Sequence, residues 1–194
     1  MRGRGAWLCF ADEAGRSLRP PKVRTWSRRG HPPRVKVTGK GGGRVSLAAL
    51  VCARSGRRTR LIHRMLVHHP GRSREKKGFR ERDFAAVLDA VHQQLGGPVV
   101  LVWDNSPHHV DARMRELLAR REKWLTVFRF PAYASELNPA EGVWANLRNS
   151  LGNLTACTTD ELAALVRTRL KKMQYRPGLL DGFIAETGLT LQPP

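Results

Sequence analysis

The stretch Val99-Val100-Leu101-Val102-Trp103-Asp104-Asn105 decides how the rest of the chain can be interpreted. Five apolar residues in a row, rich in β-branched side chains and preceded by Gly96-Gly97-Pro98, predict a buried central strand. The run ends in a carboxylate, and parallel strands of open α/β sheets deliver their C-terminal residues to the crevice where ligands bind. Asp104 is therefore either a turn-forming residue or one arm of a metal site.

The composition indicates a folded domain with a strongly positive surface. The chain has 194 residues, of which 41% are hydrophobic, and this is enough for one domain with a real core. Lys and Arg number 35 against 16 Asp and Glu, so the net charge is +19. The basic residues are spread along most of the chain, as in proteins that bind polyanions, above all nucleic acid. Since no apolar run approaches the roughly 20 residues that span a bilayer, we expect no membrane contact and a cytoplasmic location.

Hydrophobic periodicity predicts strands and helices on either side of the central strand. Glycines at 39 and 41–43 are interpreted as the turn of a hairpin rather than as a phosphate cradle, because the Gly-x-x-x-x-Gly-Lys-Ser/Thr order is missing. The predicted elements are strands over 6–11, 35–37, 45–51 and 125–130, and helices over 83–95, from about 110 to 118, over 139–151 and over 159–174.

This order of elements predicts an α/β fold. Strand–helix–strand units need right-handed parallel crossovers, whereas the early hairpin supplies antiparallel strands. The combination describes a ribonuclease H-like fold, a mixed five-stranded sheet with helices on both faces. We find no linker or repeat, so residues 1–194 are expected to form a single domain, in which residues 177–194, punctuated by Gly and Pro, form a frayed tail.

Three acidic residues stand apart from the others. Asp12 and Asp104 follow predicted strands, and Glu141 falls in the first turn of a predicted helix. If the first and central strands are neighbours, Asp12 and Asp104 come within roughly 5 Å of each other. Two carboxylates at that distance repel by about 3 kcal/mol at an effective dielectric of about 20, so a cation or a shared proton has to relieve the repulsion. Oxygen ligands without Cys or His suit Mg²⁺ or Mn²⁺, and two such ions are the standard arrangement for attacking a phosphodiester.

Glu141 also has an interpretation that needs no metal. Asn138 suits an N-cap and Pro139 a first helical residue, so Glu141 falls where a capping-box glutamate belongs. A first-turn glutamate can also point out of the helix end toward a metal, and both roles can coexist. Trp144 lies on the apolar face of the same helix and is expected in the core.

Three blocks of the sequence resemble the catalytic motifs of DDE transposases. They are Phe10-Ala11-Asp12-Glu13, Trp103-Asp104-Asn105 with His109 five positions after the aspartate, and Leu137-Asn138-Pro139-Ala140-Glu141-Gly142-Val143-Trp144. More narrowly, they resemble bacterial insertion-sequence transposases of the mariner superfamily, in which a block similar to residues 25–30 is also common. The resemblance runs from about residue 6 to residue 151, and the third block is the most specific.

The resemblance implies a catalytic core that cuts DNA at transposon ends and joins the freed 3′-hydroxyl to a target, as in DNA integration and recombination. Asp12, Asp104 and Glu141 would be the catalytic ligands of two Mg²⁺ or Mn²⁺ ions. Asn105 and His109 would orient Asp104 or contact phosphate, although His109 also fits a helix-start residue satisfied by the backbone. The other candidates for DNA contact are basic residues of two surface segments, for one of which simple solvation is the alternative: Arg28, Arg29, Arg72, Arg74, Lys76 and Lys77.

The front of the chain departs from the family pattern. Such transposases carry an N-terminal helix-turn-helix region that recognises transposon ends, whereas here the first predicted strand begins within a few residues of Met1. We expect this region to be absent, and either encoded separately as a partner subunit or lost. The expected partners are double-stranded DNA and, in a homodimer, a second copy. The alternatives to a transposase are an inactive or truncated remnant that only binds nucleic acid, and another ribonuclease H-like nuclease.

Overall fold

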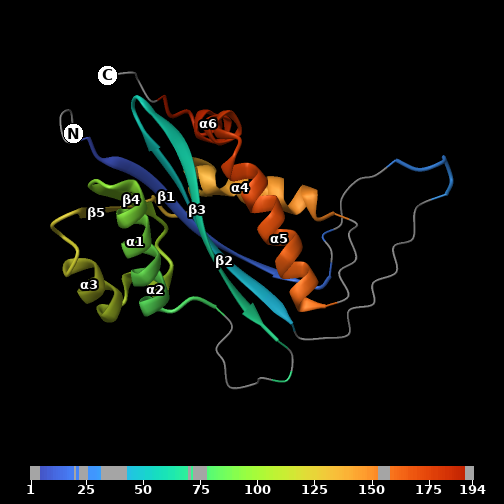
Figure 1. The fold of residues 1–194 in the computed structure, drawn as a ribbon, viewed down its shortest axis with the longest axis horizontal. Helices are drawn as coiled ribbons and strands as arrows, with labels where there is room; N and C mark the ends of the chain where they lie inside the picture. Colours follow the sequence, from blue (N-terminus) through green and yellow to red (C-terminus); the bar gives the residue numbers. More distant parts are fainter. Residues whose placement is uncertain are drawn as a thin grey trace.

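The computed structural model describes residues 5–19, 21, 26–31, 43–69, 71, 78–152 and 158–190. Its centre is a mixed five-stranded sheet in the order β3-β2-β1-β4-β5 (Figure 1). The strands are β1 (Trp7–Ser17), β2 (Arg44–Arg54), β3 (Arg57–His68), β4 (Val99–Trp103) and β5 (Leu125–Arg129). Because β1 pairs antiparallel with β2 and parallel with β4, the predicted mixed sheet is confirmed, with the first strand beside the central one.

Helices cover both faces of this sheet, as predicted (Figure 1). One face carries α1 (Glu81–Leu95), α2 (Pro107–Val110) and α3 (Ala112–Ala119), and the other carries α4 (Pro139–Ser150), α5 (Thr159–Gln174) and α6 (Pro177–Glu186). Side chains of a strand alternate between the two faces, so β2 contributes Leu47 to the α4–α6 core and Leu50 to the α1–α3 core. None of the described helices is long and apolar enough to cross a membrane.

The strands before β4 correct two predictions. The strand predicted over 6–11 does not end there but continues to Ser17 as β1, because its polar second half pairs with β2 as far as Ser17↔Arg44. The hairpin that the structure shows joins β2 to β3 through Ser55-Gly56, and β3 was not predicted because its arginines and histidines obscure the alternation of apolar residues. The predicted first hairpin strand, residues 35–37, lies outside the described residues.

The C-terminal segment corrects a third prediction. Residues 177–186 form α6 rather than a frayed tail, and Leu180, Phe183 and Ile184 are buried in the α4–α6 core. Pro177 occupies the first turn of α6, where a missing backbone N–H is tolerated. Gly142 of α4 explains the close approach of the two helices, since a Cβ at this position would meet the ring of Phe183 at 2.6 Å. The glycines that suggested fraying therefore do not prevent a packed helix.

Candidate active site

The register of the two parallel strands sets Asp12 and Asp104 side by side. β1 and β4 pair from Trp7↔Val99 to Phe10↔Val102. Continued for two residues, this register places Asp12 opposite Asp104, on neighbouring backbone segments that lie about 4.8 Å apart. Asp104 follows the last residue of β4 as predicted, whereas Asp12 lies within β1 rather than at its end.

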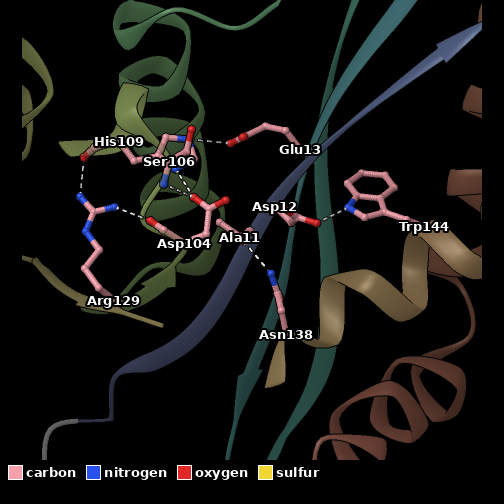
Figure 2. A network of polar contacts seen from close by, with 9 residues as sticks. All are labelled: Ala11, Asp12, Glu13, Asp104, Ser106, His109, Arg129, Asn138 and Trp144. Atoms are coloured by element: carbon pink, nitrogen blue, oxygen red, sulfur yellow. Dashed lines mark hydrogen bonds and ion pairs between the residues drawn. The ribbon is translucent and has the colours of Figure 1, made fainter. Parts of the chain in front are cut away.

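Asp12 faces α4, and two side chains of that helix region hold the helix against β1. Trp144 Nε1 donates a hydrogen bond to Asp12 Oδ2 at 2.8 Å, and Asn138 Nδ2 donates to the carbonyl oxygen of Ala11 at 3.2 Å (Figure 2). Trp144 is buried, as predicted for a core residue, but its contact with Asp12 was not predicted. The signal was its position three residues after Glu141, which places both side chains on the same face of a helix.

The charge of Glu141 reaches Asp12. Burial, followed by the charge of Glu141, raises the pKa of Asp12 to about 7, although hydrogen bonds from the backbone of Glu13 and from Trp144 oppose the shift. Glu141 itself is exposed in the first turn of α4. The predicted N-cap is confirmed, because Asn138 Oδ1 accepts a hydrogen bond from the backbone N–H of Ala140 at 3.1 Å. Two carboxylates thus share a region in which the ionised form of Asp12 is disfavoured.

Asp104 has different partners. Its Oδ1 accepts a hydrogen bond from the backbone N–H of Ser106 at 3.1 Å and lies 2.5 Å from His109 Nδ1 (Figure 2). The hydrogen bond with His109 is the largest cause that lowers the pKa of Asp104. Asp104 therefore forms a turn at the end of β4, yet 47% of its side chain stays exposed. The turn-forming role and a free carboxylate edge coexist.

His109 is buried between two carboxylates. Its ring stacks on Trp103 with the centroids 3.7 Å apart and meets Phe84 edge-on at 5.1 Å. Nε2 lies 3.1 Å from Glu13 Oε1, so the imidazole bridges Glu13 and Asp104 (Figure 2). Burial lowers the pKa of His109, but the hydrogen bonds to Asp104 and Glu13 outweigh it and raise the pKa to about 8.

Glu13 is a site residue that was not predicted from the sequence. It directly follows Asp12 on a strand, and successive side chains of a strand point to opposite faces. Glu13 therefore reaches His109 on the α1–α3 side, while Asp12 reaches Trp144 on the α4 side. The pair of acidic residues in the first block was the available signal.

Two further side chains fix the backbone around Asp104. Arg129 donates hydrogen bonds to the carbonyl oxygen of Asp104 at 2.9 Å and to that of His109. Asn105 Nδ2 donates to the carbonyl oxygen of Phe130 at 2.7 Å. The predicted candidate Asn105 thus links the ends of β4 and β5.

The three predicted metal ligands are not gathered into a closed cage. Within the part of the chain that the structure describes, no group of three or more His, Cys, Asp or Glu side chains is arranged to hold a metal ion. The backbone brings Asp12 and Asp104 together, but their carboxylates bind protein donors on opposite sides. Of the predicted DNA contacts, Arg28 and Arg29 are exposed, and the remaining four lie outside the described residues: Arg72, Arg74, Lys76 and Lys77.

Comparisons with known proteins agree with this arrangement. The model of the family described as DDE superfamily endonuclease matches residues 7–163. The Mos1 mariner paired end complex with Mg has a TM-score of 0.61 at 16% identity, covering 95% of this chain and 56% of that chain. The Mos1 strand transfer complex gives a TM-score of 0.58 at 15% identity, with 95% of this chain and 56% of that chain covered.

The catalytic domain of Mos1 mariner transposase, with 14% identity and a TM-score of 0.52, covers 95% of this chain and 84% of that domain. The chain thus spans 56% of the length of the longer Mos1 chains. None of the curated protein sequences matches it. With a family model that matches most of its length and a five-stranded sheet like that of the Mos1 domain, the chain belongs to the DDE superfamily endonucleases and has a ribonuclease H-like fold.

Proposed function

We propose that this chain is the catalytic core of a metal-dependent DNA transposase, which cleaves DNA at transposon ends and joins those ends to a target. The observation that carries the proposal is the parallel register that sets Asp12 opposite Asp104, with Glu141 close enough to raise the pKa of Asp12. Membership of the DDE endonucleases supports it. The similar Mos1 structures include a paired-end complex with a transposon end and a strand transfer complex.

The donor set of the site fits a hard divalent cation. Asp12, Asp104 and Glu141 offer only oxygen atoms, the ligands that Mg²⁺ and Mn²⁺ prefer, and Mos1 complexes were solved with each of these metals. The raised pKa of Asp12, caused by burial and by the charge of Glu141, supports the proposal because a bound cation would favour the ionised carboxylate. Two bound ions would activate the attacking oxygen and stabilise the leaving oxygen of a phosphodiester.

The protein contributes orientation of the carboxylates. Ser106 and His109 hold Asp104 through Oδ1, which leaves Oδ2 without a hydrogen-bond partner among the described residues and open to a ligand. Glu13 lies 3.1 Å from the opposite nitrogen of His109, and this ion pair favours the orientation in which the imidazole contacts Asp104. Trp144 fixes Asp12 in the same way from α4. We also propose that a helix-turn-helix region or a separate helix-turn-helix subunit recognises the transposon ends. In addition, we propose that the chain acts as a homodimer.

Nicking of supercoiled plasmid DNA in Mg²⁺ or Mn²⁺ tests this function. We expect the wild-type chain to nick the plasmid and the Asp104→Asn and Glu141→Gln variants to fall to background, because each loses a proposed metal ligand. Glu136→Gln is the matched control, since it makes the same charge change at an exposed glutamate just before α4 and should nick like the wild type. Equal nicking by all four proteins would exclude the proposed site.

A further inference from the structure

A cavity of about 850 Å³ opens beside Asp104 on the α1–α3 side of the sheet. Its wall is formed by the second half of β1, the start of β2, the first turn of α1 with the residues before it, and parts of α2 and α3. Ser106 and His109, which both contact Asp104, belong to this wall. The cavity therefore adjoins the candidate active site through residues that hold Asp104, although Asp104 itself does not line it.

The wall of this cavity carries an excess of positive charge. Five arginines and three glutamates line it. One arginine, Arg120, is paired with Glu116 at 2.5 Å, and Glu13 is already occupied by His109. No carboxylate of the described residues forms an ion pair with the other four arginines, which are Arg44, Arg80, Arg82 and Arg113.

These four arginines come from three separate elements. Arg44 begins β2, Arg80 and Arg82 lie at the start of α1, and Arg113 lies on α3. All four are exposed, so their guanidinium groups are available to a ligand. Such groups bind phosphate oxygens through two parallel hydrogen bonds. Because they are distributed around a large cavity, they suit a chain of phosphates better than a single small anion.

We propose that this cavity holds the sugar–phosphate backbone of the DNA strand that continues from the cleaved phosphate. The inference rests on the proposed function and adds the path of the DNA to it: the strand passes Asp104 and leaves over α1 and α3 rather than over α4–α6. Contacts of this kind fix the position of DNA without reading its sequence.

Two double variants separate this cavity from the general positive charge of the protein. Arg82→Gln with Arg113→Gln removes two charges from the wall. Arg57→Gln with Arg115→Gln removes two charges outside the cavity wall. Arg57 lies at the other end of the β2–β3 hairpin from Arg44, and Arg115 lies on the same helix as Arg113, two residues further along. Both control residues are exposed and neither lines the cavity. Because each double variant loses two arginines, the two variants have equal net charge.

The measurement is the affinity for a labelled DNA duplex over a salt titration, in EDTA so that neither metal nor cleavage contributes. The cavity variant should bind more weakly, and the slope of log Kd against log salt should fall by about two, roughly one for each phosphate that an arginine no longer neutralises. The control variant should keep the wild-type slope. Arg82→Lys with Arg113→Lys, which keeps both charges, should restore most of the slope and shows that folding is not the cause.

Equal slopes for the cavity and control variants would overturn the inference, because only net charge would then matter. The nicking assay is independent of this result. If the wild type nicks DNA but the two glutamine variants bind alike, the proposed function stands and the DNA follows another path. If the wild type does not nick but the cavity variant alone loses slope, the cavity binds DNA and the proposed function fails.

Discussion

Asp12 within β1 and Asp104 just after β4 lie opposite each other in the register of the two strands, yet their surroundings have opposite effects on them. Asp12 lies against α4, where burial and the charge of Glu141 raise its pKa to about 7. Asp104 faces α2, where the hydrogen bond with His109 lowers its pKa. An aspartate carboxylate is therefore disfavoured as an anion at Asp12 and favoured as an anion at Asp104.

This difference indicates on which side of the site a bound cation would have the larger effect. On the Asp104 side the protein supplies its own positive charge, because His109 has a pKa of about 8 and is held by two carboxylates. On the Asp12 side the direct donors are neutral, namely the indole of Trp144 and the backbone of Glu13. A metal ion bound between the two aspartates would relieve the repulsion that the Asp12 side otherwise retains.

The largest expected effect is a separation of activity from stability at Asp12. Asp12→Asn should abolish nicking, because a proposed metal ligand is lost, but it should raise the free energy of unfolding of the metal-free protein. Since the folded pKa is about 7 against an ordinary 3.8, the ionised carboxylate opposes folding, and this penalty grows as the pH rises between those values. The gain should therefore be full above about pH 7 and vanish in acid, as measured by thermal unfolding in EDTA.

Asp104→Asn should show the opposite sign on stability, because it removes the anion that His109 stabilises. If both asparagine variants shift the melting temperature of the metal-free protein in the same direction at neutral pH, the contrast between the two aspartates is wrong.

A smaller loss of activity is expected from Glu13→Gln. Groups that orient a metal ligand typically contribute about 10- to 100-fold, and Glu13 acts on Asp104 only through His109. With one carboxylate partner fewer, the pKa of His109 should fall from about 8, so the alkaline limb of the nicking profile should move to lower pH. Glu122→Gln, an exposed glutamate beyond α3, should change neither rate nor profile. A rate loss without a shift of the profile would point to a structural role alone.

The next effect concerns the neutral donor on the Asp12 side. Trp144→Phe removes the indole N–H that Asp12 accepts, and hydrogen bonds to charged groups contribute about 1.5–3 kcal/mol. The pKa of Asp12 should rise further, so the loss of stability should be larger above pH 7 than in acid, where Asp12 is protonated. Urea unfolding at the two pH values measures this, and a loss that does not depend on pH would assign Trp144 to packing only.

The smallest effect provides a baseline outside both halves of the site. Burial, followed by the charge of Arg167, lowers the pKa of His63 on β3 below its ordinary 6.5. Protonation of His63 therefore opposes folding, and the folded protein becomes less stable as the pH falls below 6.5. His63→Gln should remove part of the acid destabilisation and leave nicking unchanged. An acid transition identical to that of the wild type would show that His63 does not titrate in this way.

The parts that the sequence predicted well are those in which apolar periodicity and backbone chemistry agree. Val99–Trp103 is apolar throughout and buried except for the half-buried Val102, and Asn138-Pro139 carries the capping signal of α4. β3 and the second half of β1 escaped prediction because cross-strand pairing holds a polar sequence in the sheet. The acidic pair Asp12-Glu13 and the spacing of Trp144 from Glu141 mark these residues, but the partners that Glu13 and Trp144 contact depend on which side of the sheet each element packs.

A crystal structure of the protein with Mn²⁺ tests the metal site most directly. We expect anomalous density within coordination distance of the carboxylates of both Asp12 and Asp104, with Glu141 beside it and His109 still bound to Asp104. Density at other acidic groups only, with Asp12 and Asp104 unliganded, would contradict the assignment of these residues as the metal-binding centre of a DNA-cleaving enzyme.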